Sequence, residues 1–283
     1  MAEINTHVEK RIFIYATMAA TIWGLSFPVT KIGVGVTSPI AFAFLRYALA
    51  SVFFVILLLY HKKFDKPNYQ LAFLGLFGVT LPTILQNIGL KYTSAYITGF
   101  LQSTGPIYTV ILAYLFLNEK INIYKVTGIF LAFIGIYFMV QPKAGGNLFG
   151  NLLVLSSAIC YSIGGIIAKN LLSKGYESFY VIAFSSIIGT FFLLPALPFE
   201  KIIVSYESIR YILFLAIFTT FIAYLLWYAA LEKMEVSKLS FFTYLIPLFS
   251  LISSHVMLKE EIKVAAIIAG FIAVIGVAIA QKA

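Results

Sequence analysis

The chain has 283 residues, of which 61% are hydrophobic and only 11% are charged. Soluble domains carry about 25% charged residues, so this chain has too few charges to cover a water-facing surface. The composition excludes a soluble enzyme, a disordered protein and a nucleic-acid-binding module. The net charge is +9, and the basic residues lie in short clusters between long apolar runs, which suits contact with an anionic membrane leaflet.

Ten apolar segments are long enough, at about 20 residues each, to cross a bilayer as helices. The first follows Lys10-Arg11 as a signal peptide would, but it lacks a small-residue cleavage site, so we interpret it as a retained helix. The runs are too long for the strands of a barrel. We predict an all-α integral membrane protein with ten transmembrane helices. They are Ile12–Ile32, Ile40–Tyr60, Tyr69–Leu90, Ser94–Leu117, Ile123–Val140, Leu148–Ala168, Phe179–Leu197, Ile209–Ala230, Ser237–Leu258 and Val264–Gln281.

The basic residues between these segments predict the orientation of the chain. If the N-terminus is cytoplasmic, 12 of the 20 Lys and Arg residues fall on the cytoplasmic side and 7 on the other, with Arg46 inside a span. Cytoplasmic loops are enriched in basic residues, so we predict that both termini are cytoplasmic. A compact chain without a targeting extension suits a prokaryotic inner membrane.

The sequence partly matches itself when it is shifted by 141 residues. Pro106 falls on Pro247, and Glu119 falls on Glu260. We therefore predict two five-helix units, residues 1–141 and 142–283. Because five is odd, the second unit starts from the opposite face of the membrane, an inverted plan common in secondary transporters. The paired prolines point to a midplane binding site, or else they are structural kinks without ligand contact.

The ordered set of motifs resembles the EamA-type family of the drug/metabolite transporter superfamily. The motifs are Trp23-Gly24-Leu25-Ser26-Phe27-Pro28, Pro39 followed by Arg46, and the repeated Pro…Glu…Gly pattern that begins at Pro106 and Pro247. The resemblance implies a ten-helix carrier that works by alternating access and usually exports amino acids, related metabolites or drugs. It also implies a central cavity lined mainly by the first, third, fourth, sixth, eighth and ninth helices. The sixth helix has Tyr161-Ser162 where the first has Trp23-Gly24, which puts a strictly symmetric site in doubt.

Aromatic and neutral polar side chains within the predicted spans are the candidate substrate-binding residues. An amide in hydrocarbon is unfavourable unless it meets a partner or water, so each candidate either lines a wet cavity or bonds a neighbouring helix. Trp227 is equally consistent with an interfacial belt. The candidates are Trp23, Ser26, Gln86, Asn87, Gln102, Tyr161, Tyr224, Tyr228, Thr243 and Tyr244.

Charged residues divide into loop acids and one arginine within a span. All acids lie in loops or near helix ends, which argues against tightly coupled exchange of a cation for protons. Arg46 either grips a substrate carboxylate, pairs with a helix-end acid such as Glu260, or snorkels. We favour a gating or structural role for it, and the same for Pro106, Pro247, Glu119 and Glu260. The two glutamates precede the last helix of each unit, where a carboxylate favours a helix N-terminus.

Small residues form one stripe on each of the last helices of the two units. The stripes are Gly128, Ala132 and Gly135 on one helix and Ala269, Ala273, Gly276 and Ala280 on the other. Small residues allow backbones to approach closely in a membrane, so we predict scaffold packing or a homodimer through these faces. The three histidines and the single cysteine lack metal-site spacing, and we expect no metal or cofactor.

The sequence favours a secondary transporter that exports small amphipathic metabolites such as amino acids. The expected partners are a small-molecule substrate and the lipid bilayer, without nucleic acid. A multidrug or cation exporter is an alternative within transport. An intramembrane enzyme acting on lipid or lipid-linked substrates is a second class, but the chain has no HExxH, no GxSxG and no paired buried carboxylates. A passive channel is a third class, which saturation and counterflow would distinguish.

Overall fold

The computed structural model describes residues 2–62, 68–93, 95–140, 147–258 and 264–282, and within these ranges every regular element is a helix. Helices satisfy their backbone hydrogen bonds internally, as a segment in lipid must. Eight stretches of the described chain are long and apolar enough to cross a membrane: Lys10–Val36, Pro39–His61, Tyr69–Tyr92, Ile97–Leu117, Leu148–Ser173, Ser178–Phe199, Ser208–Lys233 and Val236–Met257. The shorter apolar helices Ile123–Phe138 and Phe271–Ala280 occupy the predicted fifth and tenth spans.

Several of these stretches are built from more than one helical element. In the first part of the chain the elements are α1 (Ala2–Val36), α2 (Pro39–His61), α3 (Tyr69–Gly75), η1 (Leu76–Thr80), α4 (Leu81–Tyr92), α5 (Ala95–Gln102), α6 (Gly105–Leu117) and α7 (Ile123–Val140). In the second part they are α8 (Leu148–Ser173), α9 (Ser178–Leu193), η2 (Leu194–Phe199), α10 (Ser208–Phe214), η3 (Leu215–Ile222), α11 (Ala223–Lys233), α12 (Val236–Ser240), η4 (Phe241–Leu245), α13 (Ile246–Leu258) and α14 (Val264–Ala280).

The helices that carry the paired prolines are interrupted at corresponding positions. In the first half α5 ends at Gln102, and α6 begins at Gly105 with Pro106 in its first turn. In the second half the 3-10 segment η4 separates α12 from α13, which begins one residue before Pro247. A proline is tolerated in the first turn of a helix because its missing N–H has no helical partner there. The sequence predicts that both prolines interrupt their helices, and the structure confirms this at Pro106 and at Pro247.

Two π-helical segments form a second pair. The segments η1 and η3 interrupt the third and the seventh of the spanning stretches, and the shift of 141 residues places Leu76–Thr80 inside Leu215–Ile222. π-helical turns are rare and often occur at functional sites. Both segments contribute residues to the cavity described below.

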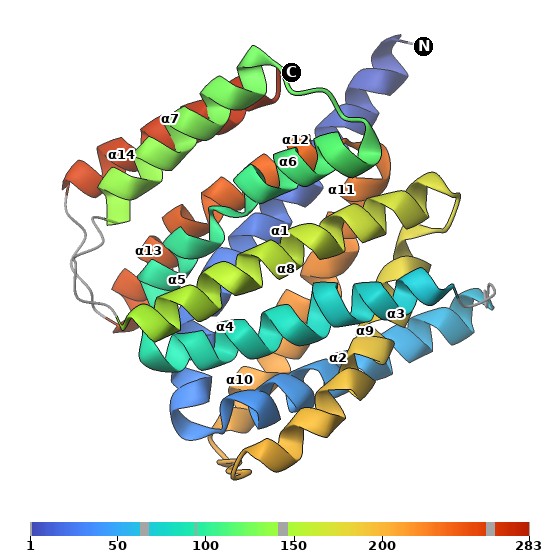
Figure 1. Cartoon of the computed structure of the whole chain (residues 1–283), viewed down its shortest axis with the longest axis vertical. Coiled ribbons are helices and arrows are strands. Elements are labelled where there is room, and N and C mark those ends of the chain that lie inside the picture. The colour runs from blue at the N-terminus through green and yellow to red at the C-terminus, as the bar shows by residue number, and fades with distance from the viewer. Residues whose placement is uncertain (1, 63–67, 94, 141–146, 259–263, 283) are drawn as a thin grey trace.

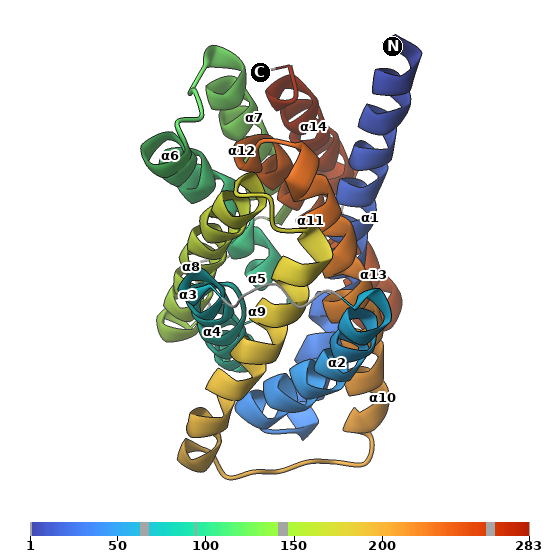
Figure 2. The ribbon, with the colours of Figure 1, turned by 90° about the vertical axis from the view of Figure 1, so that its right-hand side faces the viewer.

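The two halves of the chain are interleaved. Helix α4 packs on α8, while α1 packs on α11 and α13, and α2 packs on α9. Figure 1 and Figure 2 show α7 and α14 side by side as a pair at the edge of the molecule, near the C-terminus. Each of these contacts joins a helix of the first half to a helix of the second.

The α7–α14 pair is built on the two small-residue stripes. A Cβ atom added at Gly135 would lie 2.5 Å from the Ala273 nitrogen, and one added at Gly276 would lie 2.5 Å from the Ala132 nitrogen. The backbones therefore meet where the sequence predicts close approach. Because the two stripes contact each other within one chain, a homodimer would need other faces of these helices, and the homodimer itself stays a prediction.

Candidate functional site

A cavity of about 160 Å³ lies at the centre of the helices. A single water needs roughly 10–15 Å³ measured in this way, so the space is large enough for a small metabolite. Its lining comes from α1, α2, α4, α5, α6, α8, η1, η3, α11, α12, η4 and α13. Of the predicted substrate-binding residues, those that line the cavity are Trp23, Ser26, Gln86, Gln102, Tyr161, Tyr224, Tyr228 and Thr243.

One wall of the cavity is a cluster of aromatic rings from α1 and α11. The Trp23 ring lies 4.9 Å from Trp227 and 5.3 Å from Tyr224, measured between centroids. The Trp23 indole donates to the Thr219 carbonyl of η3 at 3.1 Å, which fixes the ring against the other half of the chain. Trp227 lines the cavity, so it does not belong to an interfacial belt.

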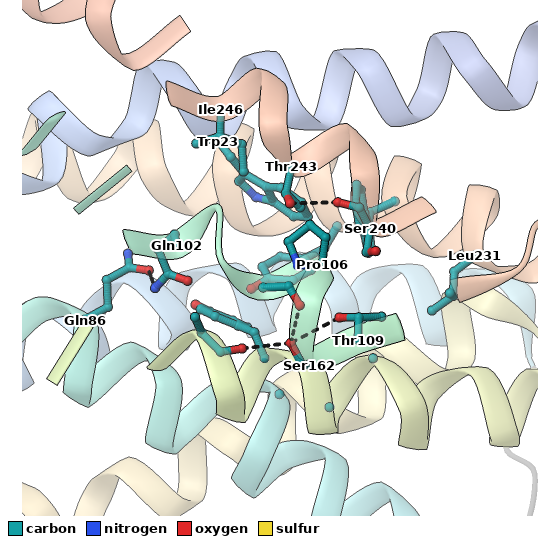
Figure 3. Close-up of a pocket in the computed structure, with 18 of the residues that line it drawn as sticks. Trp23, Gln86, Gln102, Pro106, Thr109, Ser162, Leu231, Ser240, Thr243 and Ile246 are labelled. Atoms are coloured by element: carbon teal, nitrogen blue, oxygen red, sulfur yellow. Dashed lines mark hydrogen bonds between the residues drawn. The ribbon is translucent and has the colours of Figure 1, made fainter. Parts of the chain in front are cut away.

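Another part of the lining carries amides and hydroxyls, and Figure 3 shows Gln86 and Gln102 pointing toward each other. Gln102 Nε2 donates to Gln86 Oε1 at 3.0 Å and to Ser157 Oγ at 2.9 Å. Further along, Thr109 and Ser162 are joined through their hydroxyls at 3.1 Å. These side chains from α4, α5, α6 and α8 form a polar surface that can exchange hydrogen bonds with a ligand.

Arg46 is the one charged side chain among the described residues that line the cavity. It is 5% exposed, so it does not snorkel. Its Nε donates to Thr220 Oγ1 at 2.6 Å, and its guanidinium carbon lies 5.3 Å from the centre of the Tyr47 ring. The Tyr47 hydroxyl lies 3.4 Å from that of Tyr224. Within the described part of the chain, no carboxylate forms an ion pair with Arg46.

Two predicted substrate-binding residues lie away from the cavity. Asn87 is fully buried and donates to the Pro39 carbonyl at 3.1 Å. Tyr244 is also buried, and its ring stacks on that of Phe241. Each directly follows a residue that does line the cavity, and successive residues of a helix point about 100° apart. Asn87 therefore faces α2, and Tyr244 packs in a buried apolar cluster with residues of α5, α7 and α14.

The predicted gating residues occupy different environments. Pro106 lines the cavity, whereas Pro247 lies in α13 against Gly99. Glu119 accepts hydrogen bonds from the backbone of Val236 at 2.9 Å and from Ser237. It therefore caps α12 of the other half rather than its own following helix, because the interleaved halves bring the α12 N-terminus to it. Glu260 lies outside the described residues.

Two lysines bond the last carbonyls of corresponding helices, a role that the sequence did not predict. Lys169 Nζ donates to the Leu231 carbonyl and the Met234 carbonyl, both at 2.8 Å. Lys31 Nζ does the same to the carbonyls of Leu90 and Thr93. The shift of 141 residues places Leu90 on Leu231 and Thr93 on Met234. A lysine thus satisfies the last carbonyls of α4 and of α11, where a cation also suits the helix dipole.

Small hydroxyl residues complete the cavity and were not predicted. They are Thr109, Ser162, Thr219 and Ser240. Ser and Thr within a helix can bond the carbonyl one turn earlier, as Ser162 Oγ does with Ala158 at 2.9 Å. They therefore give no clear sign in a sequence, although Ser162 follows Tyr161 directly.

Comparison with known proteins identifies relatives along nearly the whole chain. An uncharacterized transporter of Archaeoglobus fulgidus is 33% identical over 273 residues, covering 95% of this chain and 98% of its own length. A probable amino-acid metabolite efflux pump of Salmonella typhimurium is 24% identical over 272 residues, with 87% of each chain covered. A solved crystal structure superposes with a TM-score of 0.81 at 17% identity, covering 96% of each chain, which shows a shared fold.

The apolar helices and the central cavity define a multi-pass membrane protein of the transporter class. The EamA-like transporter family matches residues 10–141 and, separately, residues 148–280. The chain belongs to this family. The resemblance stated from the sequence motifs is thereby confirmed.

Proposed function

We propose that this protein is a secondary transporter that exports small amphipathic metabolites such as amino acids. The observation that carries the proposal is the central cavity, which combines an aromatic wall, an amide and hydroxyl wall and one arginine. Such a lining suits a ligand with an apolar body and a polar end. The similarity to a probable amino-acid metabolite efflux pump supports amino acids as the class to test first.

The proposed architecture is ten transmembrane helices in two inverted repeats, residues 1–141 and 142–283. The double family match, the paired proline interruptions, the paired π-helical segments and the corresponding ends of α4 and α11, each bonded by a lysine, support it. Repeat-related positions meet at the cavity, as Gln102 and Thr243 do. We place the protein in a prokaryotic inner membrane with both termini in the cytoplasm.

The proposed mechanism is alternating access. The two halves rock against each other and open the cavity to one face of the membrane and then the other. The broken helices around Pro106 and Pro247 supply the gates, and Glu119 holds one of them by capping α12. Lys31 holds α1 to the end of α4, and Lys169 holds α8 to the end of α11, as the halves move.

Counterflow in proteoliposomes tests the proposal. Vesicles are preloaded with one amino acid, and entry of the same labelled compound is followed with and without a pH gradient. Transient accumulation is expected from wild-type protein and not from Gln102→Ala, which removes the bonds to Gln86 and Ser157. Gln70→Ala is the matched control, because Gln70 is bonded to Lys174 at the surface.

Each alternative gives a different result in this assay. Labelled flux that neither saturates nor shows counterflow would replace the carrier with a passive channel. Counterflow of organic cations without any amino acid would replace the metabolite exporter with a cation exporter. Chemical conversion of an added lipid-linked substrate, without flux, would favour the enzyme.

A further inference from the structure

Arg46 gives the described lining of the cavity its one positive charge. A guanidinium stays protonated throughout the physiological pH range, and burying a charge without an opposite charge is strongly unfavourable. Its hydrogen-bond partner, the Thr220 hydroxyl, and the Tyr47 ring are neutral. The nearby hydroxyls of Tyr161 and Tyr224 are neutral as well. The positive charge is therefore not neutralised by any described residue, and it lies beside a space that can admit a ligand.

The unused donors of Arg46 reach that space. A guanidinium has five N–H groups, and only the Nε–H bonds to Thr220 within the described chain. The two terminal nitrogens, Nη1 and Nη2, have no hydrogen-bond partner in the described chain, and neither of them is fully buried. Because Arg46 lines the cavity, these nitrogens open onto the cavity itself. Their paired N–H groups match the two oxygens of a carboxylate.

We propose that Arg46 is the anion-binding residue of this cavity and that the transported substrate carries a carboxylate. The inference rests on the proposed transport function and specifies its substrate class. A carboxylate has one negative charge, which balances the one positive charge of the described lining. A phosphate dianion would leave a negative charge uncompensated in a low-dielectric space. The site therefore selects a carboxylate over a phosphate.

The aromatic cluster receives the rest of the substrate. The rings of Trp23, Tyr224 and Trp227 lie together on the same cavity. Aromatic faces bind an apolar group by burial and an ammonium group by cation–π attraction. Tyr224 links the two regions, because its hydroxyl also contacts that of Tyr47 beside Arg46. An amino acid or another small carboxylate with an apolar body satisfies both ends of the cavity.

Ligand-induced thermal stabilisation of the purified, detergent-solubilised protein tests this assignment without using transport. Four related probes separate the chemical groups: L-phenylalanine, 3-phenylpropionate, 2-phenylethylamine and 2-phenylethyl phosphate. A ligand that binds only the folded protein stabilises it by RT ln(1 + [L]/Kd), so at equal concentration the probe that binds more tightly raises the melting temperature more; each probe is used at up to about 10 mM. We expect phenylalanine and phenylpropionate to stabilise the protein more strongly than the amine or the phosphate.

Arg46→Gln removes the charge and is expected to weaken binding of both carboxylates by at least about 30-fold, as loss of one partner from a buried charge pair does. Arg46→Lys keeps the charge but loses the paired donors, and it is expected to retain part of the binding. Arg210→Gln is the matched control. Arg210 also lies over a tyrosine ring, at 4.8 Å from Tyr211, but it is exposed and outside the cavity.

The inference is overturned if no carboxylate stabilises the wild-type protein, if the amine or the phosphate stabilises it as strongly, or if Arg46→Gln responds like wild type. If Arg46→Gln fails to fold, Arg46→Lys and the ranking of the four probes on wild-type protein decide alone. Failure of the transport proposal looks different. Carboxylates would then bind and depend on Arg46, while counterflow of the same compounds in vesicles would be absent.

Discussion

At the scale of single residues, Trp23 connects the cavity to the packing of the two halves. Its ring contacts Tyr224 and Trp227, and its indole N–H bonds to the Thr219 carbonyl. Thr219 belongs to η3, a π-helical segment of the other half. One side chain therefore shapes the cavity wall and also fixes it relative to the other half of the chain.

Trp23→Ala is expected to abolish counterflow while the protein remains in the membrane. The substitution removes two aromatic contacts worth about 0.5–1.5 kcal/mol each and a hydrogen bond worth about 1 kcal/mol, and it empties one wall of the cavity. Counterflow is measured in vesicles with equal amounts of protein. Phe130→Ala is the control, because Phe130 lies on α7 with 65% of its surface exposed. Counterflow by Trp23→Ala at the wild-type rate would contradict the assignment of Trp23 to the binding site.

The sequence predicts which short segments line the cavity, but not which of two adjacent residues in a segment faces it. It identifies the polar pairs Gln86-Asn87 and Thr243-Tyr244, yet in each pair one residue lines the cavity and the other does not. The reason is geometric, because both members of each pair carry polar atoms and adjacent residues of a helix point about 100° apart. A sequence pattern does not fix the rotation of a segment about its own axis that finely. Only packing against neighbouring helices decides which of two adjacent residues points inward.

At the scale of elements, the breaks were predictable because their cause is covalent. Proline lacks an N–H and cannot continue a helix unchanged, so Pro106 and Pro247 mark both interruptions in the sequence. The π-helical segments η1 and η3 contain no proline and give no such sign. The partner of Glu119 was also beyond sequence reasoning, because α12 comes from the other half.

The α7–α14 pair gives a prediction about stability. Gly276→Ala is expected to destabilise the protein by about 1–3 kcal/mol, because overpacking forces the backbones apart. The added Cβ would lie 2.5 Å from the Ala132 nitrogen and 2.8 Å from the Gly128 carbonyl oxygen. The melting temperature in detergent measures the effect. Gly35→Ala is the matched control, because its Cβ would meet nothing within 4 Å, and alanine favours a helix over glycine. Equal melting temperatures for the two variants would contradict the close packing.

At the scale of the whole molecule, the contacts between the two halves follow the repeats that we propose. The packing of α1 on α11 is repeated by the packing of α8 on α4, and α7 packs on its own repeat partner α14. Exchanging the halves therefore returns these pairs of helices. The proposed mechanism uses this correspondence, because it needs two related arrangements in which the halves exchange their roles. Such a pair of states is what alternating access requires.

Inverted repeats place positions related by the shift of 141 residues on opposite faces of the membrane. Tyr60 and Lys201 are such a pair, and both side chains are exposed in the structure. In a Cys160→Ser background, which removes the one native thiol, we introduce Tyr60→Cys and Lys201→Cys separately. A membrane-impermeant maleimide added to intact cells is expected to label the cysteine at 201, and the cysteine at 60 only in inverted vesicles. Labelling of both from the same side would contradict the inverted topology. Labelling of the cysteine at 60 alone in intact cells would preserve the repeats but reverse the orientation, because the basic residues that favour a cytoplasmic N-terminus would then lie outside.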